Sequence, residues 1–268
     1  MGDSMTGISL SQNYREWTMK ERYDEIADLI KGAKKIVAFT GAGISTESGI
    51  PDFRSPTGIW AKFNPADFTY DKYLVDPEVR RLTWLRYRGM KAWEIEPNAA
   101  HYALVELEGM GKLDCIITQN IDGLHQKAGS SEDKVIELHG TARQVTCLEC
   151  NKRWPFEEIL GWMEAGDDDP HCDECGGLLK AATISFGQAM PVKETREAEE
   201  RARDCDLFIV IGSSLVVYPA AYMPVFALES GAPLVIINRE KTPMDHSATV
   251  VVNAGAGDTM SAIMERVR

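Results

Sequence analysis

Four of the six cysteines stand in two pairs that have the spacing of a metal site. Cys147 and Cys150 form one C-x-x-C pair, Cys172 and Cys175 form the other, and 21 residues separate the pairs. Two such pairs let four thiolates converge on one tetrahedral Zn²⁺, and four thiolates leave no open position for catalysis. Two disulfides or a redox-active pair are the alternatives, and both are less common in a reducing compartment. The spacing therefore predicts a structural zinc site, with the adjoining His171 facing solvent.

Glycines and short polar side chains follow five apolar runs of the chain. Glycine lets a backbone approach a phosphate closely, and amides, hydroxyls and carboxylates suit a ribose or a carboxamide. Each segment also has an ordinary structural alternative, such as loop packing for the glycines or a helix cap for Asp122. In chain order the residues are Gly41, Ala42, Gly43 and Ser45, then Gln119, Asn120 and Asp122, then His139, then Gly212, Ser213 and Ser214, and last Asn238.

His139 is the one titratable side chain of this set that changes charge near neutral pH. A single histidine is more often structural than catalytic. Because His139 emerges beside polar segments at a predicted strand end, it is a candidate general base.

Apolar, β-branched runs alternate with helical patterns along the chain. This alternation predicts a doubly wound, Rossmann-like α/β fold with a parallel sheet, whose strand ends would gather the polar segments at one edge. The predicted strands are residues 36–40, 115–118, 135–138, 207–211, 234–237 and 249–252, and the predicted helices are residues 21–31, 99–108, 192–203, 218–229 and 259–268.

Two stretches interrupt the alternation. Residues 49–95 are rich in aromatic side chains, with helical spacing over residues 77–93, and residues 141–187 contain the paired cysteines. We expect both stretches to pack together as a smaller zinc-ribbon and helical domain. The larger, Rossmann-like domain would then consist of residues 20–48, 96–140 and 188–268.

Composition restricts the class of protein and partner. The net charge of −12 and the sequence pI of about 5.0 argue against direct nucleic acid binding. No apolar run reaches the roughly 18 residues of a membrane span, and the N-terminus lacks a signal-peptide pattern. We therefore expect a cytoplasmic protein without a membrane partner.

Together these segments resemble the sirtuin family of NAD-dependent protein deacylases, in its bacterial or archaeal form. The motifs GAGISTESGIPDFR, TQNIDGLHQKAG, ELHG, the paired cysteines, GSSLVVYPA and NRE occur in the order of that family. The resemblance implies that NAD is consumed. The acyl oxygen of an acyl-lysine attacks the nicotinamide ribose, nicotinamide leaves, and the products are free lysine and 2′-O-acyl-ADP-ribose.

The resemblance also assigns roles to residues of the site. Asn120 and Asp122 would hold the nicotinamide carboxamide, and His139 would deprotonate the ribose hydroxyls as general base. Gln119 would position the ribose, and Ala256 would be one of the contacts to NAD.

The loop after the glycines has assigned roles as well. Asp52 would position the ribose, Phe53 would shield the reacting face from water, and Arg54 would order the loop. Thr46 stands where a dinucleotide fingerprint has its third glycine. We interpret this departure as a sign that the backbone runs from here toward the second domain. Residues 47–54 would then form a mobile flap.

Departures from the family pattern concern the substrate. Ile184 and Phe186 lie in a predicted strand that would bind the substrate backbone by strand addition, while Gln188 replaces a glutamate. Members that prefer succinyl or malonyl groups carry a Tyr-x-x-Arg pair, which corresponds here to Leu85 and Arg88. We therefore expect acetyl or another apolar acyl group, with Arg88 on a solvated helix face.

Two other functions use the same residues less completely. An ADP-ribosyltransferase or NAD hydrolase is the nearest alternative, and His139 and the predicted strand around Phe186 favour deacylation over it. A binding module without catalysis would not need Asn120, Asp122 and His139.

Overall fold

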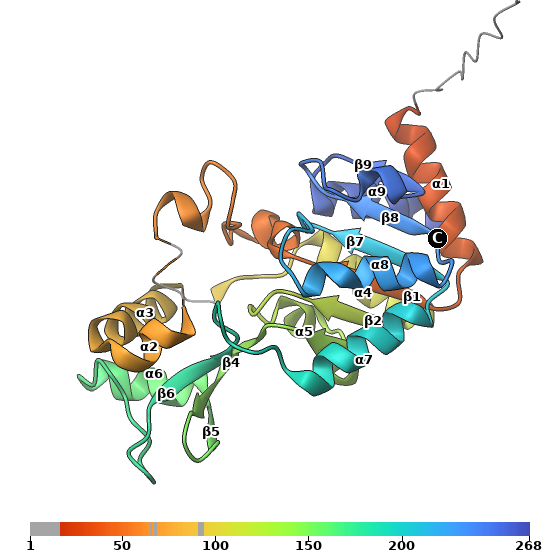
Figure 1. The fold of residues 1–268 in the computed structure, drawn as a ribbon. Helices are drawn as coiled ribbons and strands as arrows, with labels where there is room; N and C mark the ends of the chain where they lie inside the picture. Colours follow the sequence, from red (N-terminus) through yellow and green to blue (C-terminus); the bar gives the residue numbers. More distant parts are fainter. Residues whose placement is uncertain (1–16, 65, 67–68, 91–93) are drawn as a thin grey trace, which may run out of the picture.

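A six-stranded parallel sheet forms the centre of the larger part of the molecule (Figure 1). The computed structural model describes residues 17–64, 66, 69–90 and 94–268. In the order β3-β2-β1-β7-β8-β9, strand numbers fall as far as β1 and rise from β7 onward, while all strands stay parallel. This switch point between β1 and β7 confirms the doubly wound fold. The strands are β1 (Ile36–Thr40), β2 (Leu113–Thr118), β3 (Val135–Glu137), β7 (Leu207–Ile211), β8 (Leu234–Ile237) and β9 (Val250–Val252), and all six predicted strands are confirmed.

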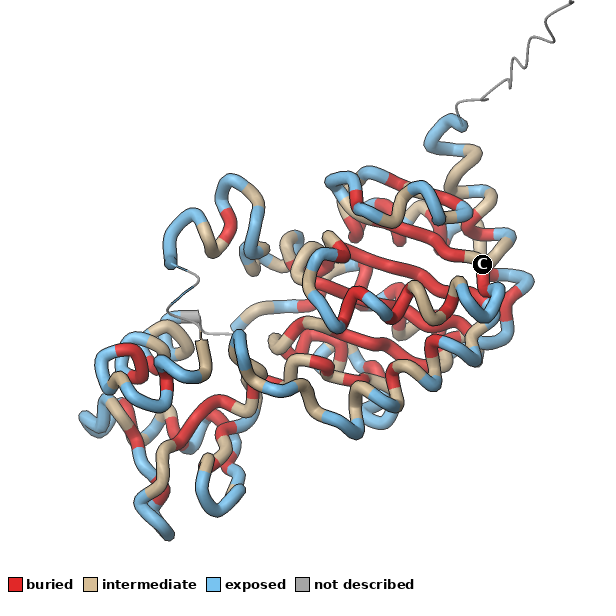
Figure 2. The backbone as a smooth tube through the Cα atoms, viewed as in Figure 1, coloured by how far each residue is buried: buried red, intermediate tan, exposed pale blue. Residues whose placement is uncertain are grey.

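The sheet is covered by helices on both faces. Helices α1 (Met19–Gly32), α4 (Ala99–Gly109) and α9 (Ala256–Val267) cover one face, and α7 (Val192–Arg203) and α8 (Met223–Glu229) cover the other. Strands β1, β7 and β8 are buried along their whole length (Figure 2). Burial on both faces explains why these strands are continuous apolar runs in the sequence.

Two predicted helix starts are wrong. Residues 218–222 do not begin α8 but form a turn and the short 3₁₀-helix η6 (Ala220–Tyr222). Pro224 has no N–H to donate to an earlier carbonyl, so it fits only in the first turn of an α-helix, and α8 begins at Met223. Helix α9 begins at Ala256, three residues before the predicted start at Thr259. Its first turn is fixed by the Glu47 carboxylate, which accepts from the Gly257 N–H at 3.1 Å.

The two interrupting stretches pack together as a smaller module beside the sheet (Figure 1). It contains the antiparallel sheet β5-β4-β6, and Trp84 packs with Val145 and Trp154 in its core. Arg80 forms a bidentate ion pair with Asp169, with 2.9 Å between Nη2 and Oδ2. The elements are α2 (Tyr70–Val75), α3 (Pro77–Met90), β4 (Gly140–Cys147), β5 (Arg153–Pro155), α6 (Phe156–Glu164) and β6 (Leu179–Thr183).

The predicted strand through Ile184 and Phe186 is wrong. Strand β6 ends at Thr183, the Ile184 N–H donates to His139 O at 2.8 Å, and Phe186 forms only an isolated bridge with Thr69. Beyond Thr183 these two contacts hold the segment. The predicted helix over residues 77–93 is α3, and residues 91–93 lie outside the described residues.

Candidate active site

Six parallel strands end at the same edge of the large sheet, and most of the predicted site residues follow them. Such an edge is where open α/β sheets bind ligands. The residues after β1, β2 and β7 are joined by direct hydrogen bonds, which are described below. The residues after β8 and at the start of α9 form a separate group.

The glycines after β1 and β7 interlock. Gly43 N donates to Gly212 O at 2.8 Å. A Cβ on Gly41 would lie 2.8 Å from Gly212 O, and a Cβ on Gly212 would lie 2.1 Å from Ile44 N. Gly212 also has a φ of 66°, which favours glycine. The glycines therefore bring two strand-end loops into contact, which is the packing role that the sequence left open.

Ser45 connects the loop after β1 to the loop after β2. It lies in the 3₁₀-helix η1 (Ala42–Ser48). Asn120 Nδ2 donates to Gly41 O and to Ser45 Oγ, each at 3.2 Å, and the Ser45 hydroxyl donates to Asp122 Oδ2 at 2.8 Å. Since the Gly41 carbonyl can only accept, the amide nitrogen of Asn120 must face it, and Oδ1 of Asn120 points elsewhere.

Asp122 has the capping contact that the sequence left open. Its Oδ1 accepts from the Leu124 N–H at 3.0 Å, where the helix α5 (Leu124–Ala128) begins. Burial raises the pKa of Asp122, while the bonds from Leu124 and Ser45 act in the opposite direction. The carboxylate is thus held in place on both oxygens.

His139 lies beside this group with a defined proton position. Its Nδ1 is 2.9 Å from Gln119 O, and a carbonyl only accepts, so Nδ1 carries the proton. Nε2 then has a free lone pair. Burial lowers the pKa of His139 below its ordinary value, against the effect of the Gln119 bond, so the imidazole is neutral at pH 7. The Gln119 side chain also donates to Ser213 Oγ at 2.8 Å, which ties β2 to β7.

The second group of predicted residues lies at the ends of β8 and β9. Asn238 Nδ2 donates to Glu240 O at 2.8 Å, and Ala256 begins α9. Glu47, 3.8 Å from Arg239 Nη2, reaches this group from η1. We expected Glu47 in the mobile flap, but its carboxylate is anchored on α9 by the Gly257 N–H. Ser214 follows the interlocked Gly212 and is half-buried.

Asp52, Phe53 and Arg54 lie in the loop after η1 and are not bonded to the groups above. Asp52 Oδ1 accepts from the N–H groups of Arg54 and Ser55, which makes a tight turn. The ring centroids of Phe53 and Trp60 are 5.2 Å apart, and those of Trp60 and Phe186 are 5.9 Å apart. These aromatic contacts extend the loop toward the predicted substrate segment, with Phe53 37% exposed.

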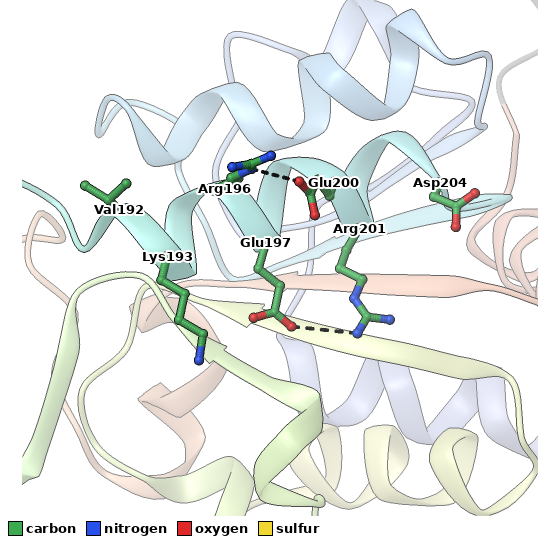
Figure 3. A pocket seen from close by; sticks show the side chains of 7 residues that line it. All are labelled: Val192, Lys193, Arg196, Glu197, Glu200, Arg201 and Asp204. Carbon is green, nitrogen blue, oxygen red and sulfur yellow. Dashed lines mark hydrogen bonds and ion pairs between the residues drawn. The ribbon is translucent and has the colours of Figure 1, made fainter.

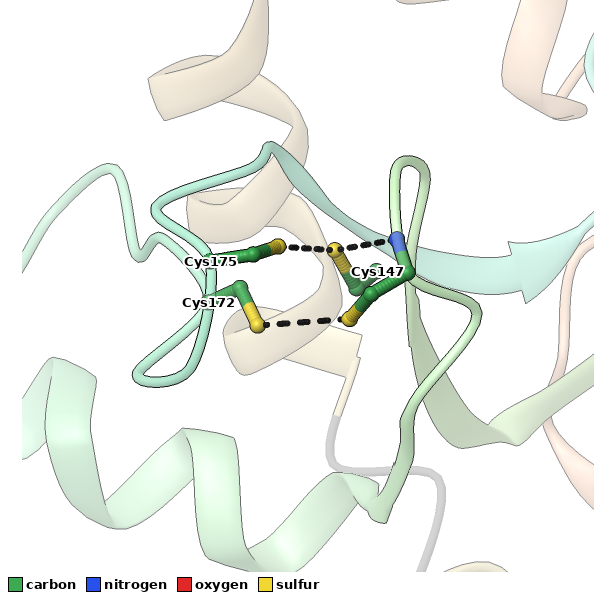
Figure 4. Close-up of side chains that lie close together, drawn as sticks. Cys147, Cys172 and Cys175 are labelled. Carbon is green, nitrogen blue, oxygen red and sulfur yellow. Dashed lines mark hydrogen bonds between the residues drawn. The ribbon is translucent and has the colours of Figure 1, made fainter.

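The four paired cysteines converge as predicted (Figure 4). The distances between sulfurs are 3.5 Å for Cys147–Cys175 and 3.7 Å for Cys150–Cys172, and all four lie within 4.8 Å of one another. Zn–S bonds of about 2.3 Å place tetrahedral sulfurs about 3.8 Å apart, so the donor set fits Zn²⁺. His171 is exposed and lies outside this cluster.

A surface groove along α7 is not part of this site (Figure 3). Two ion pairs join lining side chains along the helix. Arg196 Nε lies 3.0 Å from Glu200 Oε1, and Arg201 Nη2 lies 3.7 Å from Glu197 Oε1. The groove is a solvated, ion-paired helix face.

Comparison with known proteins relates this chain to one family. A model of the Sir2 family matches residues 41–219. The NAD-dependent protein deacetylase 2 of Streptomyces coelicolor is 45% identical over 235 residues, which cover 87% of this chain and 98% of that protein. The NAD-dependent protein deacetylase of Saccharolobus solfataricus is 45% identical over 250 residues, which cover 92% and 97%.

Solved structures give the same result. One that concerns the mechanism and regulation of Sir2 enzymes has a TM-score of 0.85 and 40% identity, and the match covers 92% of this chain and 98% of that chain. A Sir2 structure with a deacetylated p53 peptide and 3′-O-acetyl-ADP-ribose has a TM-score of 0.82 and 41% identity, and covers 90% and 96%.

Proposed function

This chain belongs to the Sir2 family and is an NAD-dependent protein deacetylase, and we propose that the strand-end residues divide the reaction among them as follows. The observation that carries the assignment is the neutral His139, with a free Nε2, beside the bonded group of Asn120, Ser45 and Asp122.

Asn120 and Asp122 hold the carboxamide of nicotinamide. Asn120 donates both of its N–H groups to the protein, so its Oδ1 remains to accept from the carboxamide N–H. Asp122 is fixed by Ser45 and Leu124 and offers its remaining lone pairs. Contacts that favour the departing nicotinamide over bound NAD would accelerate the first bond cleavage.

His139 is the general base for the ribose hydroxyls. Its Nε2 lone pair can take a proton because the Nδ1–H is committed to Gln119 O. Phe53 and Arg54 close over the reacting face, and Asp52 and Gln119 position the ribose. Gly41, Ala42, Gly43, Ser45, Gly212, Ser213 and Ser214 form the pyrophosphate end, and Asn238 and Ala256 form the adenosine end.

The acyl-lysine peptide binds as an extended chain along the segment of Ile184 and Phe186. Phe186 is 47% exposed although it lies in an aromatic row with Trp60 and Phe53, so it offers an apolar surface. Leu85 and Arg88 are both exposed, and no tyrosine stands at position 85. We infer that acetyl and other apolar acyl groups are preferred to succinyl or malonyl groups.

The zinc module supports this site without taking part in the chemistry. Cys147, Cys150, Cys172 and Cys175 would hold Zn²⁺, and the bound metal supplies folding free energy to the module. We propose residues 49–95 and 141–187 as this domain and residues 20–48, 96–140 and 188–268 as the NAD-binding domain.

We place the working protein in a reducing compartment, the cytoplasm. The zinc-site sulfurs are 3.5 Å and 3.7 Å apart, far beyond a disulfide bond, and the remaining Cys115 and Cys205 are free thiols. The partner is an acyl-lysine protein or peptide, and the net charge of −12 suits lysine-bearing substrates better than nucleic acid. Among the described residues, no helix has the length and apolar character that a membrane crossing requires.

The test is to incubate the protein with NAD and an acetyl-lysine peptide while following nicotinamide release and peptide mass. We expect one nicotinamide for each acetyl group removed. Nicotinamide release that does not need the peptide would indicate an NAD hydrolase, and ADP-ribose attached to a protein would indicate a transferase.

We expect His139→Ala to lower kcat by about 10²–10⁴-fold, because it removes the general base. The thermal midpoint of unfolding should stay near that of the parent protein. Unchanged turnover in the folded variant would contradict the assignment of the base.

A further inference from the structure

A chain of polar side chains lies buried behind Asn120. The Asn120 backbone N–H donates to Thr118 Oγ1 at 3.0 Å, and the Thr40 hydroxyl donates to the same oxygen at 2.8 Å. His125 Nε2 lies 2.9 Å from Thr40 Oγ1. Thr40, Thr118 and His125 are 0%, 2% and 1% exposed. Polar groups so deeply buried are destabilising unless they are bonded, so their pairing is specific.

The proton positions in this chain follow from the donor inventory. A hydroxyl has one proton, and that of Thr40 goes to Thr118, so Thr40 Oγ1 must accept from His125. Nε2 of His125 therefore carries the proton. The hydrogen bonds then run in one direction, from His125 through Thr40 to Thr118 Oγ1, where the Asn120 N–H also arrives.

A second buried histidine packs against the first. His101 is 0% exposed, and its ring centroid lies 5.0 Å from that of His125. His101 Nδ1 accepts from the Asn98 N–H at 3.3 Å, so its Nε2 carries the proton. Burial lowers the pKa of His101 to about 4 and that of His125 to about 3. Both rings stay neutral near neutral pH, and the donor pattern does not change.

The hydrogen bonds from His125 through Thr40 to Thr118 meet the backbone where it leaves the sheet. Strand β2 ends at Thr118, and the Gln119 N–H still has a main-chain partner, Thr40 O at 2.9 Å. The next N–H, that of Asn120, is held by a side chain instead. The path of the backbone at Asn120 therefore depends on where the Thr118 hydroxyl is held, and Thr40 and His125 hold it.

We propose that Thr40, Thr118 and His125 are positioning residues for the nicotinamide pocket. They fix the backbone of Asn120 so that its side chain meets Gly41 O and Ser45 Oγ and turns its Oδ1 to the carboxamide. This inference rests on the proposed function, which assigns Asn120 to nicotinamide. None of the three side chains touches a reacting atom.

The test is a pair of substitutions at Thr40. Thr40→Val keeps the shape but removes the hydroxyl, which breaks the chain, whereas Thr40→Ser keeps a hydroxyl. We expect T40V to weaken nicotinamide inhibition and raise the KM for NAD by about tenfold each, the effect of one lost hydrogen bond. The KM for the acetyl-lysine peptide should stay within about threefold, and T40S should behave like the parent protein.

Thr259→Val is the matched control. Thr259 is also 0% exposed, and its Oγ1 has no hydrogen-bond partner among the described residues. T259V therefore removes a buried hydroxyl that takes no part in the hydrogen bonds of Thr40, Thr118 and His125. We expect its NAD and nicotinamide constants to match those of the parent protein. An equal effect of T259V and T40V would overturn the proposal.

His125→Phe breaks the other end of the chain and decides the question if T40V does not fold. A folded T40V or H125F whose nicotinamide inhibition and KM for NAD are unchanged would overturn the proposal. The proposal would also be overturned if turnover of NAD and peptide fell only in proportion to the fraction of folded protein. That result would show that the side chain has only a structural role. If the parent protein releases no nicotinamide with NAD and peptide, it is the proposed function that fails.

Discussion

His139 is neutral because of where it is buried, and its neutrality has a measurable consequence. The group must be unprotonated to act as a base, and burial lowers its pKa below the ordinary value of 6.5. Protonation, and with it loss of activity, is therefore displaced to lower pH. We expect the acidic limb of kcat/KM against pH to lie below pH 6.5.

His171 provides the control for this measurement. It is exposed, its Nδ1 lies 2.7 Å from Asp169 O, and it is not one of the strand-end residues. His171→Gln should leave the limb in place. An acidic limb at or above pH 6.5 would show that His139 does not act as the base in this environment.

At the scale of residues, sequence predicted the groups that follow the strands but not those that hold them. Asn120, Asp122 and Ser45 were predicted because glycines and short polar side chains after apolar runs are a local pattern. Thr40 and Thr118 read as the last residues of strands, and their hydroxyls meet across 78 positions of the chain. Only the register of β1 with β2, which pairs Thr40 with Thr118, shows the contact.

At the scale of elements, the ion pair between α3 and the loop after α6 joins the two parts of the zinc module. The Arg80 and Asp169 side chains are 10% and 11% exposed. Arg80→Ala would leave Asp169 buried without a partner, and we expect the free energy of unfolding of the module to fall by about 3–5 kcal/mol. Urea denaturation followed by tryptophan fluorescence would measure it, because Trp84, Trp154 and Trp162 lie in this module.

The neighbouring arginine gives a matched control. Arg81 pairs with Asp168 at 3.2 Å, but the side chains are 42% and 76% exposed. Solvent screens an exposed pair, so Arg81→Ala should change the free energy of unfolding little. Equal losses for the two substitutions would mean that burial does not set the strength of the Arg80 pair.

Elements of the large sheet were predicted far better than those of the zinc module. A strand buried on both faces is a continuous apolar run, which sequence displays directly. Helix α6 and strands β4 to β6 were not assigned. Strand β5 has only three residues, too few to show a pattern. Helix α6 buries Phe156, Ile159 and Met163 on one face, so its helical spacing is present in the sequence and was missed. The segment at Ile184 and Phe186 has strand-like residue types, yet tertiary contacts with His139 and Thr69 decide its path.

At the scale of the whole molecule, the two buried histidines make the fold sensitive to acid. In the unfolded chain His101 and His125 take up protons near pH 6.5, whereas their pKa values in the folded protein are about 4 and about 3. The unfolded state therefore binds more protons as pH falls from about 6.5 to about 4. The two groups together should lower the free energy of unfolding by about 3 kcal/mol per pH unit in this window.

Urea denaturation at several pH values between 4 and 7 would measure this slope. His125→Phe removes one of the two titrating groups, so it should reduce their contribution by half. An unaltered slope in a folded H125F would show that the acid sensitivity arises elsewhere, for example in protonation of the zinc thiolates.

The interlock of the loops after β1 and β7 restricts how a sequence of this kind can change over time. An alanine at position 212 would collide with the backbone of Ile44, and an alanine at position 41 would collide with the backbone of Gly212. In each case the obstacle is main chain, which no second substitution can shrink. A loss of either glycine therefore has no compensating partner, and these two positions are closed to gradual drift while the loops remain in contact.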